Sequence, residues 1–247
     1  MSNLLIPNSV LPTTSRLVRV VDLSDLDISR MFQLLSLHFS GVSREQFISD
    51  LANKNYAILL ERDKDLVGFT TILAYETTFD NEPLSVIYSG DTIVSPVAWN
   101  SPVLSRSWIE SVAKIRLAFP RGPYVWMLIT SGFRTYRFLP VFWREFYPRH
   151  DCQTPTRTKR MIDQIATDRF GPRYSAAEGI VRLAHPQALK NHLADIPEHR
   201  RLNPDIEFFI TQNPGNVHGD ELVCITELKP ENLTTAGRRM AASAGNW

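Results

Sequence analysis

The sequence predicts an α/β protein of the α+β type, with a mixed, mainly antiparallel sheet covered by helices on both faces. Two patterns support this prediction. Residues 84–94 form an apolar strand that passes through a short break into an amphipathic helix over 104–119, and residues 124–130 form another strongly apolar strand. A helix between two such strands joins strands that run parallel. The charged turn at 62–65 between two apolar runs predicts an antiparallel hairpin.

The first half of the chain supplies the early elements of this sheet. Residues 16–21 alternate in polarity as a first strand. Two helical segments follow, one with its apolar positions within 31–37 and one over 43–51 that starts at a capping box. The strands of the hairpin cover 56–60 and 66–75. The sheet therefore begins with a strand, two helical segments and three antiparallel strands.

The second half is predicted to extend the sheet. Residues 139–147 are apolar and aromatic on nearly all sides, which indicates a buried element whose rings either cover the sheet or line an acyl tunnel. After a boundary at 148–155, the pattern predicts helices over 156–170 and 186–199, and strands over 179–183, 206–211 and 221–227. We divide the chain into an N-terminal arm (1–15), a core (16–150), a C-terminal extension that completes the sheet (151–235) and a flexible tail (236–247).

The composition is that of an ordered globular protein. The hydrophobic fraction is 43%, and no apolar run approaches the roughly 20 residues that span a bilayer. Residues 1–12 lack the features of a signal peptide, so we expect a cytoplasmic protein that does not associate with membranes. Cys152 and Cys224 are expected to be reduced thiols. Three histidines, at 185, 192 and 199, lack converging carboxylates, so we predict no metal site.

Charge is nearly balanced over the whole chain but uneven along it. The formal net charge is +1, and residues 106–160 hold 11 Lys or Arg against 3 Asp or Glu. The segment before it holds 7 against 12, and the segment after it holds 9 against 11. A basic centre favours a phosphorylated or acidic partner, although arginines scattered over a solvated surface give the same counts.

The order of the predicted elements resembles that of the GCN5-related N-acetyltransferase (GNAT) superfamily over residues 16–150. In that family the fourth strand and the helix after it hold the pantetheine and pyrophosphate of coenzyme A, and the fifth strand splays away to leave room for the acyl group. The resemblance implies that 84–94 is the fourth strand, 104–119 its helix and 124–130 the fifth strand. It also implies an acyltransferase that moves an acyl group from a pantetheine thioester to a small-molecule amine.

The loop after the predicted fourth strand departs from the family pattern. Family members usually carry Gln or Arg, two residues, Gly, one residue, then Gly or Ala, because small residues let backbone N–H groups approach the pyrophosphate. Residues 94–104 contain no glycine. Asn100 or Ser101 is expected to cap the helix, whose N-terminus remains available for a phosphate. Arg106 either adds positive charge for the donor or lies on a solvated helix face.

This departure favours relatives that take acyl groups from acyl carrier protein, such as homoserine-lactone synthases and long-chain N-acyl amino acid synthases, which share the core. The phosphopantetheine arm then enters the same groove without the adenine nucleotide. The basic centre, with Arg106, Lys114, Arg116 and Arg121, would meet the acidic carrier. The acyl donor is therefore acyl-CoA or a carrier-protein thioester.

Acyl transfer needs a nucleophilic amine, a polarised carbonyl and a proton for the leaving thiolate. By resemblance, backbone groups at Thr92, Ile93 and Val94 contact the thioester. Asp91 is the leading candidate for binding or deprotonating the amine, because Gly90 and Asp91 are unusual inside an apolar strand and a buried Asp must find partners. The alternative role of Asp91 is a structural hydrogen bond at a β-bulge.

Two more residues are candidates for proton transfer. Glu76, near the end of the predicted third strand, is either an alternative base or a solvated side chain. Tyr136 follows the fifth strand, where a tyrosine often protonates the thiolate in this superfamily, and core packing is its alternative role. His150, Asp151 and Cys152 are not expected to form a triad because adjacent side chains diverge.

Three classes of function remain. The first is a GNAT-like N-acyltransferase that uses no metal. The second is a catalytically inactive binding module that has kept the fold. The third is a nucleic-acid-binding protein, for which the chain holds no recognised motif.

Overall fold

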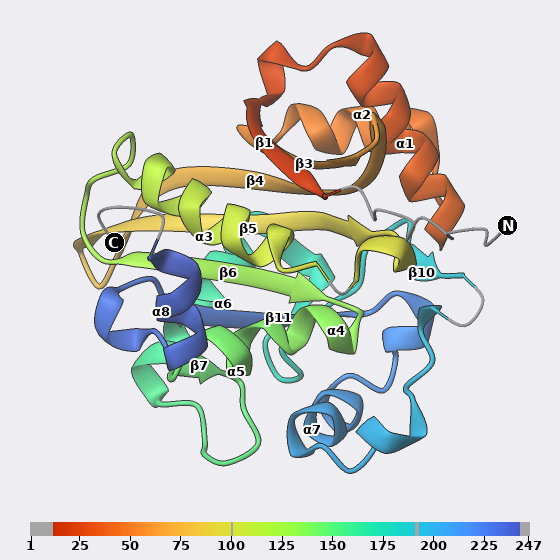
Figure 1. Cartoon of the computed structure of the whole chain (residues 1–247). Helices are drawn as coiled ribbons and strands as arrows, with labels where there is room; N and C mark the ends of the chain where they lie inside the picture. The colour runs from red at the N-terminus through yellow and green to blue at the C-terminus, as the bar shows by residue number, and fades with distance from the viewer. Residues whose placement is uncertain (1–11, 100, 191–192, 243–247) are drawn as a thin grey trace, which may run out of the picture.

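A computed structural model describes residues 12–99, 101–190 and 193–242. Its centre is one large sheet with the strand order β1-β3-β4-β5-β6-β11-β9-β8, in which β7 also pairs with β11 (Figure 1). The strands of this sheet are β1 (Thr14–Arg19), β3 (Tyr56–Arg62), β4 (Asp65–Phe79), β5 (Glu82–Val94), β6 (Tyr124–Thr130), β7 (Phe146–Tyr147), β8 (Tyr174–Ser175), β9 (Ile180–Val181) and β11 (Glu221–Glu227). A separate two-stranded sheet joins β2 (Phe39–Ser40) to β10 (Ala188–Leu189).

The fold class predicted from the sequence is confirmed. Strand β1 precedes two helices, then β3, β4 and β5 form an antiparallel meander, and helix α3 connects β5 to β6. The β5–β6 pair is parallel, and the other pairs of described strands are antiparallel. This is the GNAT-like order that the sequence resembles. Strand β11 has the predicted bounds and lies beside β6, so residues after 150 complete the same sheet.

Helices cover both faces of the sheet (Figure 1). They are α1 (Asp25–His38), α2 (Arg44–Ala52), α3 (Val103–Arg116), α4 (Phe133–Tyr136), α5 (Phe138–Phe142), α6 (Thr156–Phe170), α7 (Pro204–Gln212) and α8 (Thr235–Ala241). Since successive side chains of a strand point to opposite faces, Ile87 and Tyr88 enter different cores. Ile87 packs in the cluster that includes residues of α3, α4, α5 and α7, whereas Tyr88 packs in the cluster under α6.

The face under α6 carries a second apolar cluster further along the sheet. Met31 of α1 and Phe47 of α2 pack there on Phe69 of β4 and Ile93 of β5. This face therefore holds two separate apolar clusters, one under α1 and α2 and one under α6. The candidate site described below lies where these clusters meet.

Two predicted elements of the C-terminal part were wrong. Residues 206–211 lie in helix α7 instead of a strand, because the side chain of Asn203 caps the N-H groups of Asp205 and Ile206 and Pro204 fits the first turn. The predicted helix over 186–199 does not form over its described residues. There Ala188 and Leu189 pair with β2, and residues 198–200 form a single 3₁₀ turn.

Two boundaries also differ from the prediction. Strand β4 continues to Phe79 instead of ending near residue 75. Residues 235–241 form helix α8, most of which falls in the predicted tail, because Thr234 caps Gly237 N–H and the helix packs against α3 and α5. Residues 243–247 lie outside the described residues, as do residues 1–11 of the predicted arm.

Candidate active site

Strands β5 and β6 part at a defined point. Their parallel pairing begins at Ser85 and Tyr124 and ends at Ser89 and Leu128. Beyond this point β5 continues beside β4 alone, and the last two residues of β6 pair with β11. The ends of the two strands therefore diverge, as the resemblance implies for the fourth and fifth strands.

A β-bulge in β5 lies directly beyond this point. Phe69 pairs with Ile93 and Thr71 with Gly90, so Asp91 and Thr92 together stand opposite one residue of β4. The backbone of Asp91 has a φ of 35°, in the left-handed region that Asp adopts more readily than most residues. The β-bulge on which the structural alternative for Asp91 depends is therefore present.

The carboxylate of Asp91 has partners of its own. Its Oδ2 accepts a hydrogen bond from the Thr71 hydroxyl at 3.3 Å and lies 3.7 Å from Nζ of Lys54, and its side chain is 18% exposed. The side chain of Thr92 is held by Thr70, with 2.8 Å between their hydroxyl oxygens. The bulge thus positions the backbone of Asp91, and the carboxylate pairs with the buried ammonium group of Lys54.

Lys54, which the sequence analysis missed, lies just after the C-terminus of α2. Its side chain is 5% exposed, and Nζ lies 5.5 Å from the centre of the Tyr88 ring. Arg169 of α6 lies over the same ring, with 5.0 Å from Cζ to its centre. Two cations, one just after α2 and one on α6, therefore flank one tyrosine beside the bulge. A single Lys after a helix gives no sequence signal, because its burial depends on β5.

Glu221, the first residue of β11, brings a second carboxyl group to this place. Burial, and then the negative charge of Asp91, raises its pKa to about 8, although a hydrogen bond from the Ser131 backbone acts in the opposite direction. Burial and Asp91 also raise the pKa of Asp50 on α2. Burial raises the pKa of Tyr88 as well. Titratable groups from α2, β5, α6 and β11 thus interact where the two apolar clusters of this face meet.

The backbone candidates on β5 differ in which way they point. Ser95 N–H bonds to the carbonyl of Val67 at 2.8 Å, and the alternation of an antiparallel ladder then directs the peptide groups of Ile93 toward β4 and those of Val94 away from it. The carbonyl of Val94 accepts a hydrogen bond from the Trp99 indole at 2.8 Å. Of Ile93 and Val94, which the resemblance places in contact with the thioester, Val94 therefore faces the side where β6 departs.

A stacked pair of side chains links the ends of the diverging strands. Trp99 follows β5, Arg134 lies in α4 after β6, and Cζ of Arg134 is 4.2 Å from the centre of a Trp99 ring. Arg134 also donates a hydrogen bond to the Leu193 carbonyl at 2.5 Å. Burial, and then the charge of Arg200, lowers the pKa of Arg134. The loop after β5 thus packs on α4.

The predicted helix N-terminus after this loop is present but lacks a side-chain cap. Pro102 is the N-cap residue of α3, and the hydroxyl of Ser101 accepts a hydrogen bond from Val103 N–H at 3.3 Å. Asn100 lies outside the described residues. Arg106 is exposed on α3.

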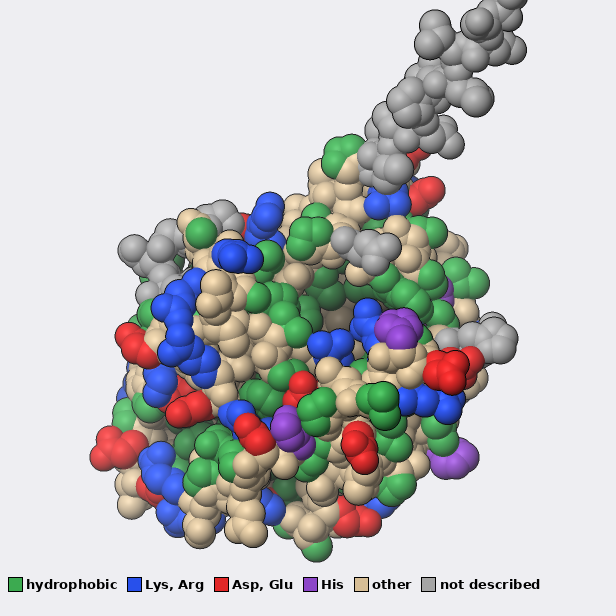
Figure 2. Space-filling view, turned by 60° about the horizontal axis from the view of Figure 1, so that its bottom comes forward, with side chains coloured by type: hydrophobic (Ala, Val, Ile, Leu, Met, Phe, Trp, Pro, Cys, Tyr) green, Lys and Arg blue, Asp and Glu red, His purple; other side chains and the backbone are tan. Residues whose placement is uncertain are grey.

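The basic centre is partly neutralised by local ion pairs. Five of its cations pair with carboxylates, namely Arg121 with Glu76, Arg149 with Asp151, Arg157 and Arg160 with Asp80, and Lys159 with Asp163. Arg116 donates to the Gly122 carbonyl at 2.7 Å. On the face shown in Figure 2, Lys and Arg side chains are interspersed with Asp and Glu, and some lie at the edge of a central hollow. Of the four residues predicted to meet a carrier protein, Arg106 and Lys114 are exposed and have no ion pair among the described residues.

Glu76 and Tyr136 are not brought to Asp91. Glu76 pairs with Ser85, six residues before Asp91 on β5, which is about 20 Å along a strand, and its carboxylate lies 3.6 Å from Arg121. Tyr136 is fully buried among aromatic rings of the opposite core, and its hydroxyl donates to the Pro148 carbonyl at 3.0 Å. The packing role that the sequence left open describes Tyr136.

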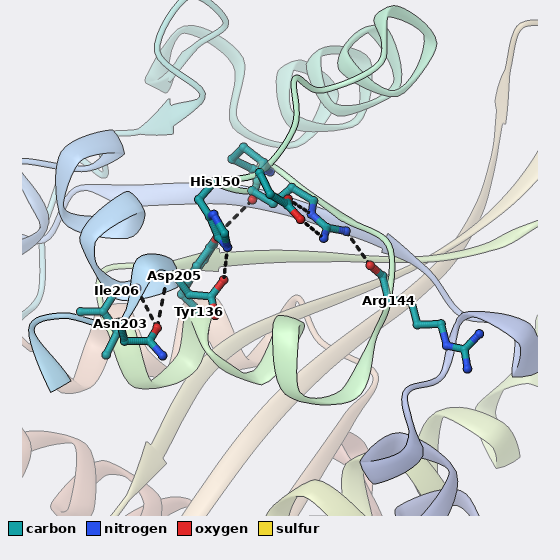
Figure 3. A network of polar contacts seen from close by, with 9 residues as sticks. Tyr136, Arg144, His150, Asn203, Asp205 and Ile206 are labelled. Atoms are coloured by element: carbon teal, nitrogen blue, oxygen red, sulfur yellow. Dashed lines mark hydrogen bonds and ion pairs between the residues drawn. The ribbon is translucent and has the colours of Figure 1, made fainter.

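The neighbours His150, Asp151 and Cys152 form no triad, and Figure 3 shows His150 pointing toward Asp205. Nε2 of His150 lies 3.6 Å from Oδ1 of Asp205 at the start of α7, whereas Asp151 pairs with Arg149. Cys152 is exposed. These contacts tie the segment after β7 to α7.

No family model and no curated protein matches this chain. Solved structures match it in part. A conserved protein of unknown function from Enterococcus faecalis V583, described as a probable N-acyltransferase, is 13% identical, with a TM-score of 0.41 over 54% of this chain and 33% of that one. This chain thus spans about a third of that protein's length.

Two Escherichia coli proteins match a similar share of this chain. The GNAT family N-acetyltransferase YhbS, in complex with CoA, is 14% identical, with a TM-score of 0.37 over 52% of this chain and 68% of that one. ElaA is 17% identical, with a TM-score of 0.37 over 58% of this chain and 93% of that one. Because these superpositions are partial, the GNAT-like fold is identified by the strand order and the parallel β5–β6 pair.

Among residues 12–99, 101–190 and 193–242, no helix combines the length and apolar character needed to cross a bilayer. Over the same residues, no three His, Cys, Asp or Glu side chains are grouped as metal ligands.

Proposed function

We propose that this protein is an N-acyltransferase that moves an acyl group from a pantetheine thioester to a small-molecule amine. The observation that carries the proposal is the divergence of β5 and β6 beside interacting carboxyl groups, Asp91 on β5 and Glu221 on β11. The diverging strands provide a place for an extended pantetheine arm. The two carboxyl groups provide the proton transfers that amide formation needs.

The two carboxyl groups are suited to different steps. Asp91, as a carboxylate, binds the ammonium group of the acceptor and takes a proton from it. The amine nitrogen then attacks the thioester carbonyl carbon, and the carbonyl electron pair moves to oxygen. When the C–S bond breaks, Glu221 gives its proton to the thiolate and regains one from the new amide nitrogen. One ammonium proton thus ends on sulfur and one is released.

The raised pKa of Glu221 supports this division of roles. A carboxyl group with a pKa of about 8 is mostly protonated at neutral pH, so it is able to donate. Asp91 is ion-paired to Lys54. Neighbouring acids with different environments commonly divide the acid and base roles in this way.

For the donor, we propose a carrier-protein thioester in preference to free acyl-CoA. The loop after β5 has no glycine. Trp99 of this loop stacks on Arg134 of α4, so these two side chains fill the space between the loop and the helix. A short phosphopantetheine arm needs fewer contacts there than a whole coenzyme A. Arg106 and Lys114 remain exposed for an acidic carrier. From the sequence, we also propose that the acyl acceptor is a small amine and that the protein acts in the cytoplasm.

The test is transfer of a radiolabelled acyl group from acetyl-CoA, long-chain acyl-CoA and acyl carrier protein to a panel of amines. We expect amide formation, fastest from the carrier protein and weakened by salt. Reversing both charges with Arg106→Glu and Lys114→Glu should raise KM for the carrier and leave that for acyl-CoA unchanged. If no donor supports amide formation, the binding-module alternative replaces the enzyme.

A second test concerns Asp91 itself. Asp91→Asn keeps the size of the side chain, and Asn also tolerates the left-handed backbone at the bulge. We expect transfer to fall by about 10²-fold or more, as general-base removal does, with a smaller effect on melting temperature. A destabilised variant with wild-type turnover per folded molecule would instead assign Asp91 to the bulge alone.

A further inference from the structure

The ammonium group of Lys54 is buried, and the described residues do not fill its hydrogen-bonding capacity. Its side chain is 5% exposed, and its contacts are the Asp91 carboxylate at 3.7 Å and the ring of Tyr88. A charge-assisted N–H···O hydrogen bond is shorter, about 2.7–2.9 Å, and Lys54 forms none with the described residues. A buried charge is costly unless it is hydrogen-bonded. The donors of Lys54 are therefore available to a bound ligand.

The position of this group identifies the part of a ligand that it would meet. Nζ lies beside Gly90, the first residue of β5 after its pairing with β6 has ended. A Cβ atom at residue 90 would lie 3.1 Å from Nζ and 3.3 Å from Cε of Lys54. Glycine thus leaves the room that the lysine head group takes, at the place where the strands part.

We propose that Lys54 contacts the carbonyl oxygen of the bound thioester and stabilises the negative charge that develops on it. This inference rests on the proposed acyltransferase function. Attack by the amine nitrogen forms the C–N bond and places the carbonyl electron pair on oxygen, and the pair returns when the C–S bond breaks. Lys54 keeps its proton throughout. A fixed positive charge in a site that excludes water stabilises such an oxyanion strongly.

The backbone geometry gives a reason for a side chain in this role. The peptide groups of Ile93 are directed into the ladder with β4, and Asp91 and Thr92 lie in an irregular bulge. Few backbone N–H groups of β5 at this point therefore face the departing β6, where they would be able to donate to the thioester carbonyl oxygen. A lysine that enters from α2 supplies a donor without changing the strand.

A simpler role for Lys54 is to neutralise Asp91. The two roles make different predictions when Asp91 is already neutral. A lysine that only balances the carboxylate has no effect in an Asp91→Asn background, whereas a lysine that contacts the oxyanion is still needed there. A double-mutant cycle therefore separates them.

The experiment measures kcat, KM for the acyl donor and melting temperature for wild type, Lys54→Met, Lys54→Arg, Asp91→Asn and the double variant Lys54→Met/Asp91→Asn. We expect Lys54→Met to lower kcat by about 10²- to 10³-fold, as loss of an oxyanion donor does, with KM within a few-fold of wild type. Lys54→Arg should recover part of the rate. Lys64→Met, which removes an exposed lysine from the β3–β4 turn, should leave kcat unchanged.

The decisive comparison is between Asp91→Asn and the double variant. Both variants lack the Asp91 carboxylate, so the loss of Lys54 in the double variant cannot act by leaving that carboxylate without its cation. A further fall of about 10²-fold in the double variant supports the oxyanion role. Equal rates for these two variants overturn it while leaving the acyltransferase intact. If wild type transfers no acyl group, the proposed function fails and this inference fails with it. A loss in Lys54→Met that follows only its melting temperature also overturns the role.

Discussion

Glu221 is the residue at which fold and chemistry are most directly linked. Glu221 is the first residue of β11. Its carboxyl group accepts a hydrogen bond from the Ser131 backbone after β6, and desolvation, together with the negative charge of Asp91 on β5, raises its pKa. Its side chain loses part of its contact with water on folding and interacts with the negative charge of Asp91, and its pKa rises from the usual 4.5 to about 8. Its protonation state therefore links stability to pH.

The sign of this linkage gives a prediction for Glu221→Gln. Below pH 4.5 the carboxyl is protonated in both states, and between 4.5 and about 8 only the folded state keeps the proton, so stability is lost as pH rises through this range. A glutamine cannot ionise. The melting temperature of the variant relative to wild type should thus increase from about pH 5 to 8 and then level off.

Thermal melts at half-unit pH steps check this prediction. Glu231→Gln, at an exposed position, serves as the control and should follow the wild-type curve. Under the proposed mechanism, the transfer rate of wild type should also fall above about pH 8, where Glu221 loses its proton. Parallel melting curves for Glu221→Gln and wild type would contradict a raised pKa of Glu221 in the folded protein.

At the scale of elements, the turn between α3 and β6 fixes where β5 and β6 part. Ser85 N–H bonds to the Pro123 carbonyl at 2.9 Å, and its hydroxyl bonds to the Phe119 carbonyl at 3.1 Å. Gly122 has a φ of 68°, and a Cβ there would lie 1.9 Å from the Pro83 carbonyl oxygen. The turn thus packs on the first residues of β5 and sets the register of the parallel pair.

We therefore predict that Gly122→Ala is strongly destabilising. The alanine must adopt a left-handed backbone, which costs about 1–2 kcal/mol, and must also push backbone atoms of β5 aside. Gly179→Ala is a matched control, because Gly179 has a φ of 73° with no atom within 4 Å of its Cβ position. Chemical denaturation should show a clearly larger loss for Gly122→Ala. Equal losses would mean that the turn moves freely relative to β5.

At the scale of the molecule, the C-terminal residues are part of the core. Strand β11 pairs with β6 over six residue pairs and buries Leu222, Val223 and Cys224. Asn232 then anchors the following segment, since its amide donates to the Glu145 carbonyl at 3.0 Å and its oxygen accepts from Glu145 N–H at 2.8 Å. The predicted boundary near residue 150 thus separates two parts of one sheet.

A fragment of residues 1–150 should consequently fail to fold cooperatively, because β6 would become an edge strand with its apolar side chains exposed. A chain that ends at Thr234 keeps β11 and Asn232 and loses α8. We expect this control to melt cooperatively at a lower temperature than the full chain. Circular dichroism during heating distinguishes the two, and a cooperative transition in the 1–150 fragment would show that the core is independent.

The sequence by itself determined the elements whose signals are local. Apolar periodicity identified the meander, α1, α3, β6 and β11, and the cap at Ser43 marked the start of α2. Gly90 and Asp91 in an apolar strand drew attention to the bulge. The local signal failed at 206–211, where apolar residues suit a strand or a helix equally and the Asn203 cap decides.

Only the tertiary structure decided which charged residues meet. Four of these residues lie far apart in the sequence: Lys54 follows α2, and Asp91, Arg169 and Glu221 lie in β5, α6 and β11. Nothing in the local pattern of any one of them distinguishes it from a solvated side chain. The close approach of these residues, and the raised pKa of Glu221, arise from packing between distant elements. For the same reason, the sequence did not show that Glu76 pairs with Ser85, which is six residues before Asp91 on β5.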